Sequence, residues 1–411
     1  MNAILEKPAE LLPDFEVNPY ATYALWREAA PVVWSDAFFG GAWLLTRHAD
    51  VEAALRDPRL SAQRTGGWVM DVAEGDRAAL GPFQRLFARA LLFLDQPEHP
   101  RLRQVLMPAF RPQRLQALQP EIEQFAAELV DALPRTEPFD FMERIARPLP
   151  VRVIARIMGV DLALESDFMR WADDLAAFIG AVRPTTEQAR IAQKSLLEMA
   201  AYFEQDLLPR RRRNPEDDLV TELVQARDDG RITSDTELLA QCAMLLFAGY
   251  ETTRNLLGNG MLVLMEHRDQ WDLLCRDPAL VPQAVRELLR FDSPVQWTGR
   301  RVASSMVLHG QQLRRGDLVL PLIGSANHDP RRHSDPDRLD VQRANPGALS
   351  FGSGAHVCIG AALTQMEAQT LFTQLVQKRP DLVQAGPVVR NGNPVYRGIL
   401  ALPVQGGDAR T

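Results

Sequence analysis

The chain has 411 residues, of which 46% are hydrophobic and 24% are charged, a composition typical of a globular protein with a sizeable core. Its 46 basic and 53 acidic residues give a formal net charge of −7, which argues against a large basic surface for nucleic acid. The cysteines, Cys242, Cys275 and Cys358, are odd in number and widely spaced. We therefore expect neither a disulfide framework nor a CxxC zinc site.

Targeting signals are not evident in the sequence. The amino-terminal segment contains several acids and no apolar stretch of the kind found in signal peptides. The most apolar segment, residues 238–265, contains Glu251 and Arg254, whereas a membrane span needs about 20 nearly uncharged residues. The sequence therefore predicts a soluble, cytoplasmic protein with no membrane span.

The predicted elements change in character along the chain. β-Branched and aromatic runs at 32–34 and 43–46 predict a short hairpin. From about residue 100 to residue 290 the pattern is helical, with apolar residues at steps of three and four through 115–133. Asn214-Pro215 predicts another helix start, because asparagine favours the N-cap and proline the first helical position.

One long helix is predicted around residue 250. Residues 234–237 read Ser-Asp-Thr-Glu and fit a capping box, in which serine and glutamate satisfy free N–H groups reciprocally. No proline follows until Pro278. A helix of roughly thirty residues is therefore possible, long enough at ~1.5 Å per residue to cross a domain. Because most of its surface is apolar, we expect burial on nearly all sides.

Short strands and a long loop follow this helix. Residues 294–324 predict short strands, with turns at His309-Gly310 and Arg315-Gly316. Residues 327–354 form a loop rich in Pro, Asp and Gly, and loops longer than about 12–15 residues usually have a function. A last helix is expected from about Cys358 to Arg379, followed by short strands. No composition break appears, so we expect one mainly α domain over residues 1–411 with a minor β portion.

The end of the long loop carries the candidate chemistry. Residues 351–360 read FGSGAHVCIG. A cysteine at the start of a helix has a lowered thiol pKa, because the free N–H groups and positive potential there favour the thiolate. Glycines at 352, 354 and 360 would let a flat ligand approach the backbone. The alternative interpretation of a lone cysteine is a buried, inert side chain.

This segment matches F-x-x-G-x-[HR]-x-C-x-G at every fixed position, and on it the chain resembles the cytochrome P450 family of the soluble bacterial type. The resemblance implies that Cys358 is the thiolate ligand of the iron of haem b. It also implies that Phe351 and Gly352 lie beside the sulfur and that His356 contacts a haem propionate. A thiolate ligand favours O–O cleavage, which makes O2 the co-substrate. The implied fold places the haem between the long central helix and the helix after Cys358.

A charged motif earlier in the chain also occurs in the family's order. Glu287-Leu288-Leu289-Arg290 resembles the family's E-x-x-R, whose two ends share a helix face and can form a charge-assisted network. Pro336-Asp337-Arg338 resembles the P-x-R expected to complete that network. The resemblance implies that Glu287, Arg290 and Arg338 support the haem pocket structurally. Taken alone, such a pair is more often a solvated surface pair.

A second motif supplies groups for the haem propionates. His99 and Arg103 are four residues apart and therefore lie on one helix face. They match the family's H-x-x-x-R, and Arg300 matches a further arginine on a later strand. The resemblance implies that all three bind propionates. Separately, each would be a surface residue.

A polar interruption lies midway along the long apolar helix, at Ala248-Gly249-Tyr250-Glu251-Thr252. A glycine there costs about 1 kcal/mol relative to alanine, and buried Glu and Thr add desolvation. Thr252 can bond back to the carbonyl of Ala248. A polar patch facing a neighbouring helix is the alternative interpretation. The segment resembles the family's A-G-x-[DE]-T, which implies an oxygen-binding groove at Ala248 and Gly249, with Thr252 stabilising the iron-bound peroxo species and Glu251 relaying protons.

The resemblance covers nearly the whole chain and implies a haem-dependent monooxygenase. It would insert one atom of O2 into an apolar small molecule by hydroxylation or epoxidation, in terpenoid or polyketide tailoring. Because no flavin or nicotinamide motif is present, electrons would come from a ferredoxin and an NAD(P)H-dependent ferredoxin reductase. A haem sensor and a peroxygenase are the alternatives, and the pair Glu251 and Thr252 weighs against both. By family position, the pocket side chains are Trp68, Phe178, Met244, Phe247, Val295, Trp297 and Tyr396.

Overall fold

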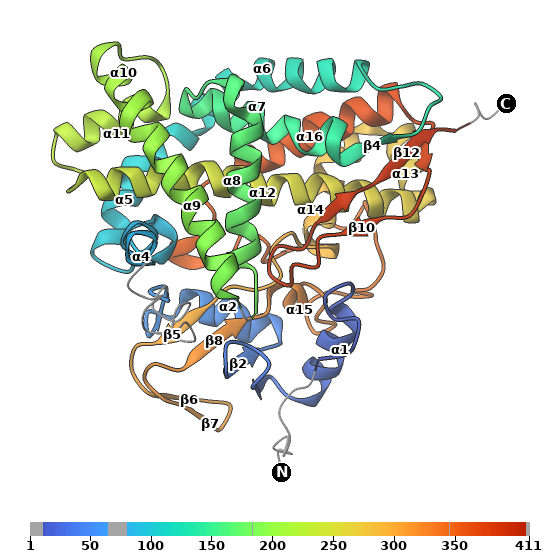
Figure 1. Cartoon of the computed structure of the whole chain (residues 1–411). Helices are drawn as coiled ribbons and strands as arrows, with labels where there is room; N and C mark the ends of the chain where they lie inside the picture. Colours follow the sequence, from blue (N-terminus) through green and yellow to red (C-terminus); the bar gives the residue numbers. More distant parts are fainter. Residues whose placement is uncertain (1–10, 65–79, 183, 345, 408–411) are drawn as a thin grey trace.

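The computed structural model describes residues 11–64, 80–182, 184–344 and 346–407 (Figure 1). The α-helices are α1 (Tyr20–Ala29), α2 (His48–Arg56), α4 (Gly81–Phe87), α5 (Glu98–Leu106), α6 (Pro112–Asp131), α7 (Pro148–Met158), α8 (Glu165–Ile179), α9 (Thr186–Tyr202), α10 (Leu208–Arg213), α11 (Leu219–Asp228), α12 (Asp235–Glu266), α13 (Arg268–Arg276), α14 (Val281–Phe291), α15 (Ile323–Asn327) and α16 (Ala361–Lys378). The strands are β1 (Val32–Ser35), β2 (Ala42–Leu45), β3 (Leu60–Ser61), β4 (Phe139–Asp140), β5 (Arg300–Val302), β6 (Met306–Leu308), β7 (Gln311–Leu313), β8 (Leu318–Pro321), β9 (Leu382–Gln384), β10 (Val389–Arg390), β11 (Ile399–Ala401) and β12 (Pro403–Gly406). The mainly α prediction with a minor β portion is confirmed.

The helices and the largest sheet occupy opposite parts of the molecule. In Figure 1, α12 runs across the helical part, while β2, β5 and β8 lie at the other end beside α1 and α15. That sheet has the strand order β1-β2-β8-β5-β3, in which β2 and β8 are parallel and the other pairs are antiparallel. The predicted hairpin at 32–46 forms its β1–β2 edge.

The long helix α12 is 32 residues long and buried along most of its length, as its apolar pattern predicted. Its N-cap is Ser234, whose hydroxyl accepts a hydrogen bond from the N–H of Glu237 at 3.1 Å. The Glu237 carboxylate accepts from the N–H of Thr233 at 2.7 Å, so half of the predicted capping box forms. Ala248 is exposed and Thr252 is half-buried, which places a polar opening on an otherwise covered helix.

Two predicted helix starts are wrong in detail. Asn214 follows the last residue of α10, and the next helix, α11, begins at Leu219. Its N-cap is Asp218, whose carboxylate accepts from the N–H of Thr221 at 2.8 Å and therefore satisfies a free donor of the first turn. The last long helix begins at Ala361 rather than at Cys358.

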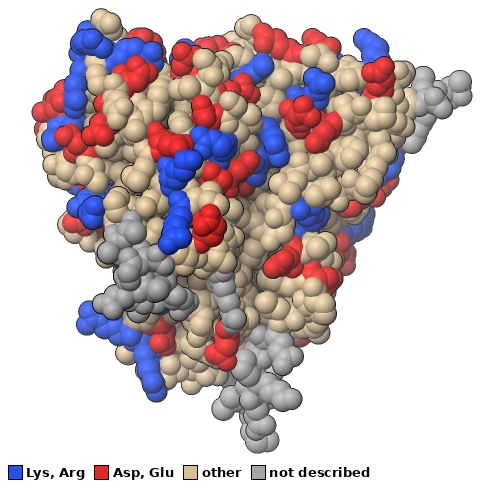
Figure 2. Space-filling model, viewed as in Figure 1, with Lys and Arg blue, Asp and Glu red and all other residues tan. Residues whose placement is uncertain are grey.

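The core and the surface agree with the composition. One continuous set of buried apolar residues extends from Phe15 to Val404. Figure 2 shows acidic and basic side chains interspersed over the face in view, without a large basic area. Within the described ranges, no helix combines the length and the apolar character needed to cross a membrane.

Candidate active site

Two adjoining cavities lie against α12. The first, here called the cysteine cavity, has a volume of about 260 Å³ and is lined by residues of α5, α12 and the segment 350–359. The second, the aromatic cavity, has a volume of about 210 Å³ and is lined by several aromatic side chains, which are Phe39, Phe247, Trp297 and Tyr396. The two cavities share Leu92, Ala248, Thr252, Val295, Thr298 and Cys358. A ligand in one cavity would therefore lie next to a ligand in the other.

The loop before α16 places Cys358 at the junction of these cavities. Gly352 and Gly354 adopt left-handed backbone conformations, with φ of 73° and 75°, which favour glycine. The chain then folds back, so that the N–H of Cys358 donates to the carbonyl of Phe351 at 2.9 Å. Phe351 and Gly352 both line the cysteine cavity. The predicted proximity of Phe351, Gly352 and Cys358 is therefore present.

The thiol of Cys358 differs from the other cysteines in its exposure. Cys358 is exposed, whereas Cys242 is buried and Cys275 is partly buried. Surrounding protein raises the pKa of the Cys358 thiol, while the N–H of Gly360 and the charge of Arg103 act in the opposite direction. The exposure is toward the cavities, since Cys358 lines both. This sulfur is therefore placed to ligate a metal centre held in the cysteine cavity.

Four basic or imidazole side chains from three separate segments line the cysteine cavity, namely His99, Arg103, Arg300 and His356. The rings of His99 and His356 lie 4.0 Å apart between centroids. Burial, together with the neighbouring charges of His99 and Arg300, lowers the pKa of His356 to about 3. Burial lowers the pKa of Arg300 to about 10. The positive charge of this cluster is therefore not balanced by an acid within it.

A ligand with two negative charges would neutralise the positive charge of this cluster. Burial lowers the pKa of His99, and the charge of Arg103 acts in the same direction. The His99 Nε2 atom is buried without a hydrogen-bond partner among the described residues. Asp95 is an acid that acts on His99 and Arg300, but its carboxylate already accepts from the N–H of Ala62 at 2.9 Å. The donor set therefore fits the two propionates of a haem whose iron is ligated by Cys358.

The face of α12 opposite Cys358 carries Ala248 and Thr252, which line both cavities. The Thr252 hydroxyl donates to the carbonyl of Ala248 at 3.2 Å, as the sequence predicted. Gly249 was expected at the same groove, but it lines neither cavity. An added Cβ at Gly249 would lie 2.8 Å from the Cδ1 atom of Ile154, so this glycine permits close packing of α12 on α7.

Glu251 is fully buried and lines neither cavity. One carboxylate oxygen accepts from Arg254 at 2.7 Å and from Asn255 at 3.0 Å, while the other has no partner among the described residues. Arg254 also forms an ion pair with Asp173, whose side chain is 41% exposed. Burial raises the pKa of Glu251, and Arg254 partly opposes this shift. Glu251 is therefore connected to the surface through a chain of charged groups.

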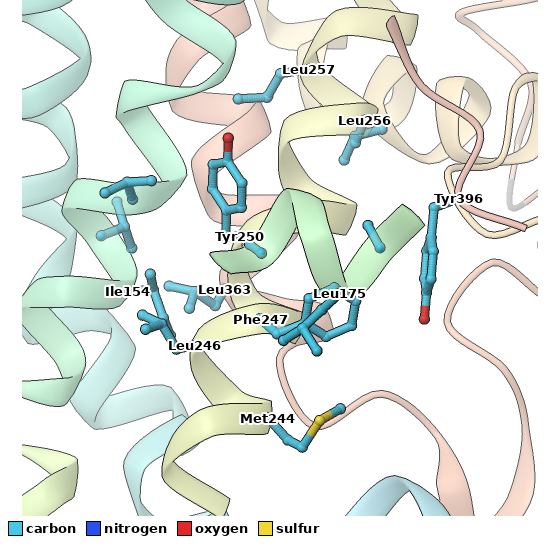
Figure 3. Packing of buried hydrophobic residues seen from close by; sticks show 14 of the residues in the cluster. Ile154, Leu175, Met244, Leu246, Phe247, Tyr250, Leu256, Leu257, Leu363 and Tyr396 are labelled. Atoms are coloured by element: carbon cyan, nitrogen blue, oxygen red, sulfur yellow. The ribbon is translucent and has the colours of Figure 1, made fainter. Parts of the chain in front are cut away.

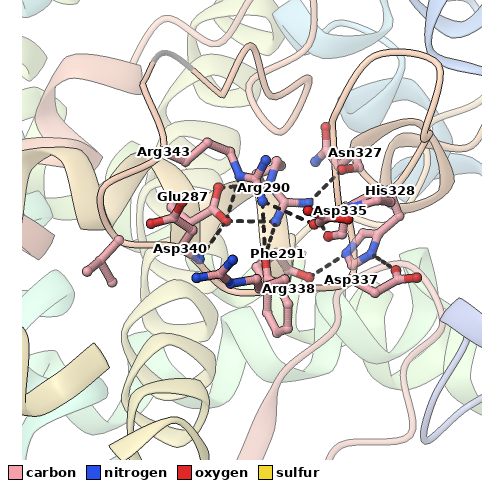
Figure 4. A network of polar contacts seen from close by, with 12 residues as sticks. Glu287, Arg290, Phe291, Asn327, His328, Asp335, Asp337, Arg338, Asp340 and Arg343 are labelled. Carbon is pink, nitrogen blue, oxygen red and sulfur yellow. Dashed lines mark hydrogen bonds and ion pairs between the residues drawn. The ribbon is translucent and has the colours of Figure 1, made fainter. Parts of the chain in front are cut away.

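The predicted support network around Glu287 is present with a different third member (Figure 4). Both carboxylate oxygens of Glu287 accept from Arg290, at 2.7 and 2.8 Å. Arg290 also donates to the carbonyls of Asn327 and Pro336, which fixes the long loop. Arg343 forms the second ion pair with Glu287, at 3.0 Å.

Arg338 joins this network through its backbone and not through its side chain. Its side chain is exposed, and its contribution is a carbonyl oxygen that accepts from Arg290 at 3.3 Å and from Arg343 at 3.1 Å. A turn of the loop directs Arg338 outward and brings Arg343, five positions later in the sequence, over Glu287. No local sequence signal distinguishes these two arginines, because only the path of the loop decides which one reaches Glu287.

The predicted pocket residues divide between the two cavities. Met244 lines the cysteine cavity and Val295 lines both cavities. Phe247, Trp297 and Tyr396 line the aromatic cavity. Figure 3 shows Met244 and Phe247 along α12, with Tyr396 on a separate segment. A β-bridge between Val295 and Tyr396 holds the two segments together.

The remaining predicted pocket residues are Phe178 and Trp68. Phe178 does not line either cavity, because its ring is buried and packs edge-on against Phe83 at 5.3 Å, while the next residue, Ile179, lines the aromatic cavity. Trp68 lies outside the described residues. Phe39 and Arg64 line the aromatic cavity but were missed, because they belong to irregular segments with no periodic pattern.

Comparisons with known proteins agree with this site. The family described as Cytochrome P450 matches residues 72–274 and 278–379. The chain is 35% identical over 399 residues to 6-deoxyerythronolide B hydroxylase of Saccharopolyspora erythraea, covering 95% of this chain and 96% of the relative. It is 33% identical to the polyketide biosynthesis cytochrome P450 PksS of Bacillus subtilis, covering 95% of this chain and 96% of that protein. The tirandamycin C-bound P450 monooxygenase TamI shares the fold with a TM-score of 0.87 and 35% identity, over 97% of this chain and 100% of that chain.

A cysteine and a threonine that line the same cavity, beside a basic donor set for propionates, fit the class of haem-thiolate proteins that activate O2. The chain belongs to the cytochrome P450 family. It is a monooxygenase that uses haem-thiolate chemistry, O2, a small-molecule substrate and redox partners.

Proposed function

We propose that this cytochrome P450 hydroxylates or epoxidises an apolar small molecule that binds in the aromatic cavity, with haem b in the cysteine cavity. The observation that supports this proposal is the shared lining of the two cavities, which includes Cys358, Ala248 and Thr252. Cys358 would ligate the iron, while His99, Arg103, Arg300 and His356 would hold the propionates. The bound haem supplies the oxygen-activating chemistry.

Protons for the reaction would come through α12. The Thr252 hydroxyl faces both cavities and is oriented by its bond to the Ala248 carbonyl. Glu251 is held by Arg254, which reaches the partly exposed Asp173. Because burial raises the pKa of Glu251, this carboxyl can hold a proton more readily than an exposed glutamate. Glu251 would take protons from the surface side, and Thr252 would donate at the cavity.

The substrate we propose is a polyketide or terpenoid tailoring intermediate. The aromatic cavity is lined mainly by apolar side chains such as Phe247, Val295 and Leu320, which favour an apolar body. A polyketide is favoured by the names of the relatives, which include a polyketide biosynthesis cytochrome P450 and a structure with tirandamycin C bound.

The electron donors we propose are a ferredoxin and its NAD(P)H-dependent reductase, acting in the cytoplasm where NAD(P)H is available. The sequence carries no dinucleotide or flavin motif that could replace them. A mixed-charge surface, as on the face in Figure 2, suits transient docking of such a partner.

The purified haem-loaded protein tests the proposal. Its ferrous carbon monoxide complex should show the strongly red-shifted Soret band of a thiolate-ligated haem. Product should form with electrons and O2. A protein that binds haem but forms no product, either with electrons and O2 or with peroxide, would be a sensor. One that needs peroxide and ignores electrons would be a peroxygenase, and either result would contradict the proposal.

A further inference from the structure

Arg64, the residue that follows β3 by three positions, contributes a guanidinium to the apolar lining of the aromatic cavity. The guanidinium carbon lies 4.7 Å from the centroid of the Phe93 ring. The stem lies against Gly299, where an added Cβ would be 2.7 Å from the Cδ and 3.2 Å from the Nε of Arg64. Phe93 and Gly299 therefore position this guanidinium, and a side chain at 299 would displace it.

The positive charge of Arg64 is not neutralised by a neighbour in the described part of the chain. Its hydrogen bond there is a long one, 3.4 Å from Nη1 to the carbonyl of Ala62. Burial, together with the nearby charge of Arg300, lowers the pKa of Arg64 to about 9. Arg64 nevertheless stays charged at neutral pH. The Arg64 side chain is half-buried, and a ligand that provides a counter-charge would offset the partial desolvation of its guanidinium.

Tyr396 supplies a second donor at the same place. It lines the aromatic cavity, and the charge of Arg64 acts on its phenol. Burial raises the pKa of Tyr396, so the phenol keeps its proton. A guanidinium and a phenol O–H near one another form a donor pair suited to a carboxylate.

The geometry points to a carboxylate-binding subsite formed by Arg64 and Tyr396, and we propose that the substrate is an apolar carboxylic acid. This inference rests on the proposed function and specifies its substrate class. The acid group would bind at Arg64, while the apolar body would extend along Phe247 toward Ala248 and Thr252. Oxidation would therefore occur at a carbon remote from the carboxylate.

The alternative anion for Arg64 is a haem propionate. The four groups assigned to the propionates, His99, Arg103, Arg300 and His356, line the cysteine cavity, whereas Arg64 does not. Arg64 lines the aromatic cavity instead. The charge of Arg64 also lowers the pKa of His356, so Arg64 lies near this cluster. The position of its guanidinium over the Phe93 ring and in the lining of the aromatic cavity favours a substrate carboxylate, and the propionate role is an outcome of the test.

The test uses spectral titration of the haem-loaded ferric protein with dodecanoic acid and abietic acid, each compared with its methyl ester. Wild type should bind at least one acid about ten-fold or more tightly than its ester, as expected for a charge-assisted pair. Arg64→Gln should abolish that preference, Arg64→Lys should retain part of it, and Tyr396→Phe should reduce it several-fold. Arg59→Gln is the matched control, because Arg59 is exposed and paired with Asp57, and it should leave the preference unchanged.

Equal binding of acid and ester by wild type would overturn the inference, and so would an acid preference that survives in Arg64→Gln. A third outcome is an Arg64 variant that keeps its acid preference and instead loses haem or shifts the haem potential. Either change would assign Arg64 to a propionate and overturn the inference. The carbon monoxide spectrum of each variant is recorded in parallel. Failure of the proposed function would abolish either that spectrum or product formation with electrons and O2, whereas failure of this inference would leave both intact.

Discussion

The three cysteines occupy three different environments, which gives each a separate expectation. Cys358 is exposed toward both cavities, Cys242 is buried within α12, and Cys275 is partly buried on α13. Cys358→Ala should abolish the red-shifted Soret band of the ferrous carbon monoxide complex together with turnover. Cys242→Ala and Cys275→Ala should keep both. Retention of the thiolate spectrum in Cys358→Ala would assign the ligand to another residue.

Thr252 is the hydroxyl that α12 presents to both cavities. Thr252→Ala should keep haem and substrate binding, because the threonine holds neither group. It should lower product per NAD(P)H by roughly ten-fold or more, since a positioned proton donor contributes at least ~10²-fold, and it should raise peroxide release. Thr252→Ser restores the hydroxyl and is the control. Unchanged coupling in the alanine variant would exclude the proton role.

Glu367 on α16 is a buried acid whose Oε2 atom has no partner among the described residues, and burial raises its pKa well above the ordinary value of 4.5. The folded protein therefore holds a proton that the unfolded chain releases above pH 4.5. Stability is lost as the pH rises from that value to the folded pKa, by up to about 1.4 kcal/mol per pH unit.

Glu367→Gln should remove this loss. The variant should be more stable than wild type at pH 7 and equal to it below pH 4, as measured by urea unfolding at several pH values. Glu204→Gln, at an exposed position, should change stability by less than about 0.5 kcal/mol. A variant that is less stable than wild type at pH 7 would show that Glu367 is ionised in the fold.

Among individual residues, the sequence identified those lining the cysteine cavity that belong to compact motifs. Cys358, His356, His99, Arg103 and Arg300 all line the cysteine cavity as expected. Each lies in a short motif or on a regular element, so local spacing predicts its direction. Arg64 was missed because it follows a two-residue strand, and its orientation depends on Gly299, more than 200 positions away.

Among the elements, the long loop before Cys358 depends on one ion-pair cluster. Glu287 and Arg343 form a pair in which Glu287 is fully buried and Arg343 is 13% exposed. Arg343→Ala should destabilise the protein by about 1.5–3 kcal/mol, because it removes one charged hydrogen bond to a buried acid that remains paired with Arg290. It should also weaken haem retention, because the loop ends at Cys358.

Arg338→Ala is the matched control for this cluster. The Arg338 side chain is exposed, and the carbonyl oxygen it contributes is unaffected by the substitution. It should change stability by less than about 0.5 kcal/mol. Urea unfolding and haem loss to apomyoglobin measure both variants. A larger loss of stability and haem in Arg338→Ala than in Arg343→Ala would show that the Arg338 side chain has the structural role.

Most elements could be predicted because their signals are local. The capping serine and the apolar surface of α12 predicted its length. The start of α11 was misplaced because Asn214-Pro215 imitates a cap, whereas Asp218 makes the capping bond and also pairs with Arg211 at 2.5 Å. That second contact is tertiary and has no signature in the local sequence.

Over the whole molecule, a large buried apolar cluster extends from Phe15 to Val404 and a smaller one extends from Val32 to Leu349. The single domain expected over residues 1–411 stays a prediction. Asp292 joins distant segments of the chain. Its carboxylate accepts from the Tyr20 hydroxyl at 2.8 Å and pairs with Arg397 at 2.6 Å and Arg390 at 3.8 Å. Burial alone would raise the pKa of Asp292, but Arg397 and Arg390 hold it below the ordinary value of 3.8.

Asp292→Asn should therefore cost about 3–5 kcal/mol at pH 7, because Arg397 would remain buried without its acid. The contribution of Asp292 is present above its unfolded pKa and is lost as the pH falls through the folded value. The difference between wild type and variant should shrink below pH 3.8. Asp229→Asn, in an exposed pair with Arg231, is the control. A difference that persists at low pH would contradict the electrostatic role.

The parallel pairing of β2 with β8 has a consequence for biosynthesis. Trp43 lies opposite Val319, so the amino-terminal hairpin acquires its sheet neighbour only after some 276 further residues have been translated. Until then the backbone N–H and C=O groups at this edge of β2 have no partner strand. They are available to other newly synthesised chains on neighbouring ribosomes. Newborn chains should consequently need chaperone protection, and slow translation of the 294–321 stretch should lower the yield of intact enzyme.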